Sequence, residues 1–154
     1  GQSDDPRFEK GATVKWFIGP SPGNLKREQV VKELEQAIST WAQVLPISFE
    51  RTEDKSHANC TFTWANHSPD NLFKFDGKGG AIAHSTNDGV QFDISEKWET
   101  ADSESGDMHS FVILPVALHE IGHFLGLQSH SSMSADVMSP FYVVNRTKLT
   151  KSDI

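Results

Sequence analysis

Apolar and polar residues alternate along the chain with two different periods, and each period predicts a different kind of element. The alternation over 13–18 predicts a β-strand, which the glycines and prolines of 19–23 end. Apolar residues then recur every three or four positions, as in an amphipathic helix. We expect Asn24 to cap this helix and Pro46 to mark its end. Its apolar stripe comprises Val30, Leu34, Ala37, Ile38, Trp41 and Leu45, and its polar face is expected to carry Lys32, Glu33, Glu35, Gln36 and Ser39.

Further strands are predicted at 47–51 and 60–64, with shorter ones at 80–84 and 90–94. A helix between strands 13–18 and 47–51 indicates a βαβ unit, in which a right-handed crossover joins two parallel strands. The turn formers Asn87, Asp88 and Gly89 separate the last two strands. One face of strand 60–64 is expected to carry Cys60, Phe62 and Trp64.

A second helix is predicted in the last third of the chain. Residues 101–110 are polar and are expected to form a loop, after which an apolar stripe returns at helical spacing from about 110 to 127. Pro115 fits only the first turn of such a helix, and Gly126 suits its end. The chain therefore predicts two main helices.

The composition is that of one folded domain. The chain has 154 residues, of which 36% are hydrophobic and 23% charged, enough for a single hydrophobic core. We expect one domain over 1–154, with a loose segment at 1–11. The predicted fold class is α/β, with a twisted, mixed, mostly parallel five-stranded sheet. No apolar run reaches membrane-spanning length, so no membrane span is expected.

Charge and cysteine content narrow the possible partners. A formal charge of -7 without a dense block of Lys and Arg argues against nucleic acid. The surplus of carboxylates suits binding of divalent cations, although a solubilising surface is the default interpretation. The single cysteine, Cys60, is expected to be a buried thiol on a strand. N-x-S/T triplets begin at Asn59, Asn66 and Asn145 and are compatible with a secretory route.

The strongest chemical signal is the segment 119–130, which has the form H-E-x-x-H-x-x-G-x-x-H. Histidines four apart on a helix project from one face, so His119 and His123 can reach one ion. Gly126 allows the left-handed turn that brings His130 back as a third ligand. Three neutral ligands and an open position predict a catalytic zinc site.

Glu120 lies between the two helical histidines and is the candidate general base. Zinc lowers the pKa of a bound water to about 7 and polarises a carbonyl, and the carboxylate can take the proton and pass it to a leaving amine. The alternative is two ordinary core histidines and an unrelated third. That alternative also requires Glu120 and Gly126 to occur by chance.

This motif is shared by the metzincins, and the chain resembles one branch of them, the matrixins or matrix metalloproteinases, from about Arg7 to its last residue. The segment 137–142, Val-Met-Ser-Pro-Phe-Tyr, resembles the family's methionine turn, with Met138 as the turn residue. The resemblance implies that Pro140 and Tyr142 line a pocket for a hydrophobic residue after the scissile bond. It implies a secreted zinc endopeptidase that acts on extracellular proteins and is met by protein inhibitors.

A peptide substrate is expected to pair with the edge strand near Ala81 to His84, with Ala83 as a substrate-binding residue. Segments 75–84 and 92–98 also resemble the matrixin calcium site. Calcium binding is physically consistent with these residues, since glycines let backbone carbonyls converge beside carboxylates. The alternative is a glycine turn beside a solvated acidic patch. The calcium ligands implied by the resemblance are Asp76, Gly77, Gly79, Ala81, Asp93 and Glu96.

The chain departs from the matrixin pattern at the second, structural zinc. His84 matches one of its ligands, whereas His67 and Asp70 are approximate counterparts because their spacing differs. Gln91 stands where the family usually has a histidine, and the loop between His84 and Asp93 is shorter than usual. We expect the second zinc to be absent or weakly bound.

Other features bear on regulation and extent. No Pro-Arg-Cys-Gly segment occurs, so no self-inhibition is expected, and the chain begins at Gly1 like a processed fragment. Residues 149–154 resemble the start of the family's last helix, here truncated. We expect a monomer that cleaves protein or peptide substrates. Two alternatives remain: another metzincin branch, and a non-hydrolytic zinc-binding interaction module.

Overall fold

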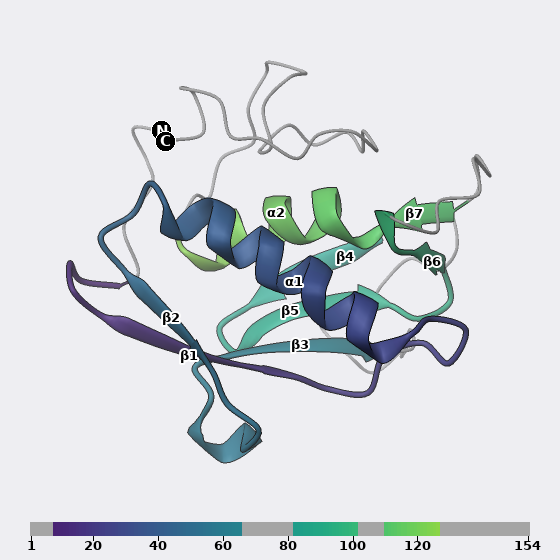
Figure 1. Cartoon of the computed structure of the whole chain (residues 1–154), viewed down its shortest axis with the longest axis horizontal. Coiled ribbons are helices and arrows are strands. Elements are labelled where there is room, and N and C mark those ends of the chain that lie inside the picture. The colour runs from purple at the N-terminus through teal and green to yellow at the C-terminus, as the bar shows by residue number, and fades with distance from the viewer. Residues whose placement is uncertain (1–7, 66–81, 102–109, 127–154) are drawn as a thin grey trace.

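The computed structural model describes residues 8–65, 82–101 and 110–126 (Figure 1). These residues form strands, two α-helices and one short 3-10 helix in a mixed order. The elements are β1 (Thr13–Ile18), α1 (Arg27–Ala42), β2 (Ser48–Arg51), η1 (Lys55–His57), β3 (Cys60–Ala65), β4 (Ala83–Thr86), β5 (Gly89–Asp93), β6 (Lys97–Glu99), β7 (Ser110–Val112) and α2 (Ile113–Phe124).

The main sheet has five strands in the order β2-β1-β3-β5-β4. β2, β1, β3 and β5 are parallel to one another, whereas β4 is antiparallel to β5 and occupies one edge of the sheet. Pairing of Thr13 with Ser48 confirms the parallel arrangement of the βαβ unit. The turn at Asn87 and Asp88 joins β4 to β5, as predicted. The predicted mixed, mostly parallel five-stranded sheet is confirmed.

Both helices cover the same face of this sheet, with α1 and α2 in contact above the strands (Figure 1). The strands turn alternate side chains toward the helices, because successive residues of a strand point to opposite faces. The expected face of β3, including Cys60, is buried. The strand side chains of this core are Val14, Trp16, Ile18, Cys60, Phe62, Trp64, Val90 and Phe92.

The ends of α1 differ from the prediction, as does one of its polar positions. The helix begins at Arg27 with Lys26 as N-cap, and no side chain caps it. The predicted cap, Asn24, is therefore wrong; its amide instead donates a 3.5 Å hydrogen bond to the carbonyl of Trp98. The helix ends at Ala42, ahead of Pro46. Glu33, expected on the polar face, is buried with 5% of its surface exposed.

The region before α2 also departs from expectation. Where a loop and then a helix from about 110 were expected, Lys97–Glu99 and Ser110–Val112 pair as a separate two-stranded parallel sheet. α2 begins at Ile113, three residues after the predicted start near 110, and Pro115 lies in its first turn as predicted. Gly126 has a φ of 118°, which confirms the predicted turn after the helix.

The described part of the expected loose segment is held against the core. The ring centroid of Phe8 lies 5.6 Å from that of Phe124, and the amide of Gly11 donates a 2.7 Å hydrogen bond to the carbonyl of Pro46. Phe8 and Gly11 thus contact the rest of the domain, and looseness of the segment 1–11 stays a prediction. In the part of the chain that the structure describes, no helix is both long and apolar enough to span a bilayer.

Candidate metal centre

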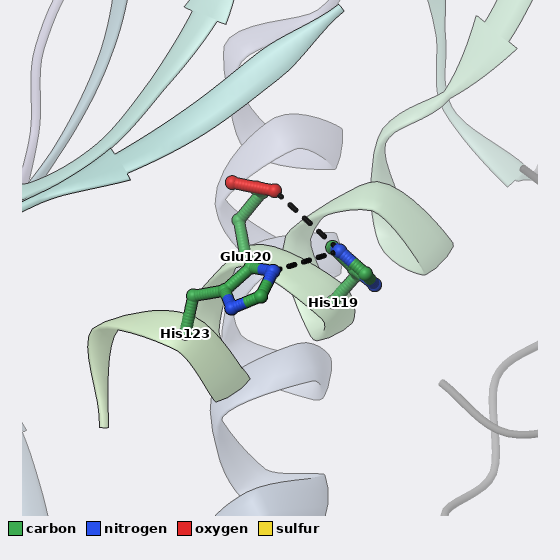
Figure 2. A group of neighbouring side chains, drawn as sticks. All are labelled: His119, Glu120 and His123. Atoms are coloured by element: carbon green, nitrogen blue, oxygen red, sulfur yellow. Dashed lines mark hydrogen bonds and ion pairs between the residues drawn. The ribbon is translucent and has the colours of Figure 1, made fainter. Parts of the chain in front are cut away.

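The candidate centre lies on α2, where one helical turn separates His119 from His123. Their Nε2 atoms are 3.1 Å apart, and their rings meet edge to face at 83°, with centroids 4.7 Å apart. Figure 2 shows the Nε2 atoms of the two rings turned toward each other. The spacing of four residues therefore has the predicted effect of bringing two imidazoles together on one face of the helix.

Glu120 reaches the same point from its neighbouring position (Figure 2). Its Oε1 atom is 3.8 Å from His119 Nε2, and its side chain is only 9% exposed. Oε2 is buried and has no hydrogen-bond partner among the described residues. Burial disfavours the charged form and raises the pKa of the Glu120 carboxyl from 4.5 to about 7.

These three side chains fit a metal ion. Their ligand atoms lie within 4.8 Å of one another. Two nitrogens bound to one tetrahedral zinc at about 2.0–2.1 Å would be roughly 3.3 Å apart, close to the observed 3.1 Å. The unpartnered oxygen of Glu120 is a second sign that the site is completed by something else. The third predicted ligand, His130, lies outside the described residues.

Two side chains of α1 that the sequence analysis did not assign to the site hold α2 in place. The Glu33 carboxylate accepts hydrogen bonds from the amides of Leu114 (2.7 Å) and Ala101 (2.9 Å). The indole of Trp41 donates a 2.9 Å hydrogen bond to the carbonyl of Leu118, the residue before His119. The signal for Glu33 was its position three residues after Val30, which places it at the border of the apolar stripe.

Two of the predicted calcium ligands are buried at the end of β5, Asp93 as its last residue and Glu96 three residues further on. Asp93 is fully buried, and its Oδ1 accepts hydrogen bonds from the amide (2.9 Å) and hydroxyl (2.7 Å) of Ser95. Its Oδ2 has no hydrogen-bond partner in the described parts of the chain. Glu96 is 5% exposed, and the Trp98 indole donates to the Asp93 carbonyl at 2.7 Å. The other predicted ligands, Asp76, Gly77, Gly79 and Ala81, lie outside the described residues.

The predicted second zinc can be followed only at one of its candidate ligands. His84 lies on β4, partly buried, and burial lowers the pKa of its imidazole. Gln91 is its direct partner across the β4–β5 pair. The residue that departs from the matrixin pattern therefore stands beside the one that matches it. His67 and Asp70 lie outside the described residues, so a weak or absent second zinc stays a prediction.

Of the residues predicted to bind substrate, Ala83 is within the part of the chain that the structure describes. Ala83 opens β4, the edge strand that packs against α2. One side of β4 is paired with β5, which leaves the other side of its backbone without a strand partner among the described residues. Met138, Pro140 and Tyr142 lie outside the described residues.

Comparison with known proteins gives a consistent answer. A model of the matrixin family matches residues 7–154. Stromelysin-3 of Mus musculus is 35% identical over 142 residues, covering 88% of this chain and 27% of that protein. The hatching enzyme of Paracentrotus lividus is 30% identical over 152 residues, 96% of this chain and 25% of that protein. Matrix metalloproteinase-26 of Homo sapiens is 32% identical over 136 residues, 84% of this chain and 49% of that protein.

A mostly parallel sheet with the H-E-x-x-H segment on a helix against it defines a metalloprotease of α/β class. The chain belongs to the matrixin family of metalloendopeptidases. The resemblance drawn from the motifs is thereby confirmed, and another metzincin branch is no longer an alternative. The chain spans about a quarter of the length of stromelysin-3 and of the hatching enzyme.

Proposed function

We propose that this domain is a zinc-dependent endopeptidase in which His119, His123 and His130 hold one zinc ion and Glu120 is the general base. The observation that carries the proposal is the 3.1 Å approach of two Nε2 atoms beside a buried carboxylate. The positive φ of Gly126 supports the third ligand, because it turns the chain after α2.

Bound zinc would supply a Lewis acid that polarises the scissile carbonyl and lowers the pKa of water. Glu120 is placed to take the proton from that water and to deliver it to the leaving amine nitrogen. Without a neighbouring cation, burial holds the pKa of this carboxyl at about 7. The positive charge of an ion would shift the pKa downward and favour the carboxylate form that a base needs.

The substrate in this proposal is an extended segment of an extracellular protein. Its backbone adds near Ala83 to the side of β4 that pairs with no other described strand, and main-chain pairing tolerates many sequences. β4 packs against α2, so a strand added there runs beside the candidate metal centre. A hydrophobic side chain after the scissile bond would enter a pocket formed with Pro140 and Tyr142.

We also propose a calcium ion beside β5, held in part by Asp93 and Glu96. A fully buried carboxylate oxygen without a hydrogen-bond partner in the described chain is costly unless a cation or water satisfies it. Calcium prefers several hard oxygen ligands, and the buried carboxylates of Asp93 and Glu96, three residues apart in the sequence, could supply some of them. The ion would stabilise the segment leading from the sheet toward α2.

A fluorogenic peptide with a hydrophobic residue after the cleaved bond tests the main proposal. Wild type should cleave it, chelation should abolish cleavage, and added zinc should restore it. Glu120→Gln should bind zinc but lose roughly 100- to 10,000-fold in kcat, because the proton acceptor is removed. Glu35→Gln is the matched control, since Glu35 is exposed on α1, and it should cleave like wild type.

The rival from another functional class is a zinc-binding interaction module without hydrolytic activity. Its distinguishing feature would be equal inactivity of wild type and Glu120→Gln on a broad peptide library while both bind zinc. A wild-type domain that cleaves after zinc loading, with a Glu120→Gln variant that does not, rejects this rival. Undiminished cleavage after complete metal removal would reject the zinc mechanism itself.

A further inference from the structure

α2 carries the candidate zinc ligands, yet its own sequence does little to fix its position. Its N-cap residue, Val112, has no side-chain hydrogen bond. Pro115, the third residue of the helix, has no amide hydrogen for a cap to accept. Of the amides that an N-cap side chain normally satisfies, the one of Leu114 therefore remains.

Hydrophobic packing does not define the rotation of α2 sharply either. Ten of its twelve residues are buried, Glu120 among them, so burial extends around most of the helix rather than along one face. Hydrophobic contacts have no preferred direction, so close packing restrains the helix without selecting particular points along it. Directional hydrogen bonds at defined points add such a restraint.

Glu33 supplies such a bond from a different helix. Glu33 has 5% of its surface exposed, and its carboxylate accepts hydrogen bonds from the Leu114 amide at 2.7 Å and the Ala101 amide at 2.9 Å. Acidic groups are favourable at a helix N-terminus, and a bond from an amide to a carboxylate is stronger than one between neutral groups. Glu33 thus does what an N-cap residue would do, and also joins α2 to the chain after β6.

A second bond from α1 fixes α2 further along. The Trp41 indole donates to the carbonyl of Leu118, at 2.9 Å, immediately before His119. Glu33 and Trp41 therefore attach α2 to α1 at two points, one at its first turn and one at the residue preceding the first imidazole. Two fixed points restrain both the axial shift and the tilt of a short helix.

We propose that Glu33 is a positioning residue of the zinc centre, which places His119 and His123 by capping α2 from α1. Metal sites tolerate displacements of ligands of only about 0.5 Å, and residues that support the ligands typically change metal affinity 10- to 100-fold when replaced. The role rests on the zinc centre proposed above. It concerns metal affinity and turnover as well as stability of the fold.

Two variants of Glu33 separate capping from packing. Glu33→Met keeps most of the side-chain volume but cannot accept either hydrogen bond. Glu33→Gln keeps one acceptor oxygen and should fall between wild type and Glu33→Met. Glu35→Gln, an exposed change of the same charge two positions away, is the control.

The zinc dissociation constant, measured by competition with a chromophoric chelator, should rise roughly tenfold in Glu33→Met and stay at the wild-type value in Glu35→Gln. Hydrogen exchange at the Leu114 amide should accelerate in Glu33→Met, because its acceptor is lost. With zinc saturating, kcat for the fluorogenic peptide should fall while KM changes little, since the hydrogen bonds of Glu33 go to Leu114 and Ala101 rather than to the edge strand β4.

A Glu33→Met domain that melts at lower temperature but keeps the wild-type zinc dissociation constant and kcat would overturn the proposal, because the role would then be structural alone. If Glu33→Met does not fold, Glu33→Gln decides: a raised zinc dissociation constant supports the proposal, and one equal to that of Glu35→Gln overturns it. Failure of wild type to bind zinc would overturn both proposals. Tight binding by wild type and by the Glu33 variants alike removes only the role of Glu33.

Discussion

Replacing Glu120 by glutamine should stabilise the metal-free domain above neutral pH, although it lowers the activity of the zinc-loaded domain. The Glu120 side chain is 9% exposed, and this burial raises the pKa of its carboxyl from 4.5 to about 7. Above pH 7 the folded protein must keep a charge in a site that disfavours it, whereas the unfolded chain ionises that group freely in water. Glutamine has the same shape and no charge to bury.

The sign and size follow from proton linkage. Because the folded-state pKa is raised, the folded state binds more protons than the unfolded state between pH 4.5 and about 7, and stability of the wild type falls as pH rises through this window. The pKa difference corresponds to roughly 3 kcal/mol at about 1.4 kcal/mol per tenfold change in equilibrium. For a domain of this size that is on the order of 10 °C in melting temperature.

The assay is thermal and urea unfolding of the chelated domain, followed by circular dichroism at several pH values. Wild type and Glu120→Gln should unfold alike near pH 4.5 and diverge by roughly 3 kcal/mol by pH 8. Glu35→Gln controls for loss of one exposed charge and should track wild type. If wild type and Glu120→Gln show the same pH dependence, burial of Glu120 does not perturb its ionisation and the reasoning is refuted.

Three further changes test other parts of the structure. Gly126→Ala places a side chain at a φ of 118° and should lower the free energy of unfolding, measured in urea, by about 1–2 kcal/mol. An unchanged free energy of unfolding would show that the turn after α2 relaxes without cost. Trp41→Phe removes the donor to the Leu118 carbonyl and should lower the free energy of unfolding by about 1–2 kcal/mol; a melting temperature equal to wild type would show that this bond contributes nothing. Calcium at about 100 times its dissociation constant should stabilise wild type by roughly 2.7 kcal/mol, and Asp93→Asn should lose most of that rise in melting temperature. A melting temperature of wild type that does not respond to calcium would reject the calcium site.

Local sequence patterns were sufficient for most of the fold. The strand at 13–18 has the predicted bounds, and the first helix occurs where it was predicted although both of its ends differ, because alternation and helical spacing are properties of neighbouring residues. β6 and β7 were missed, since three-residue strands are too short to show a period. The prediction that Asn24 caps the first helix was wrong. The helix has Lys26 as its N-cap residue and no side-chain cap, because a suitable residue type does not by itself make the hydrogen bond.

The sequence by itself determined the chemistry of the candidate centre: the spacing of His119 and His123 on a helix, the acid between them, and a glycine after the helix. These features depend on contacts within a few residues, which the chain carries wherever it folds. Only the tertiary structure decided how that helix is held. The Leu114 amide meets a carboxylate 81 residues earlier, and the Leu118 carbonyl meets an indole 77 residues earlier. Such partners are chosen by the packing of α1 on α2, which no local period encodes.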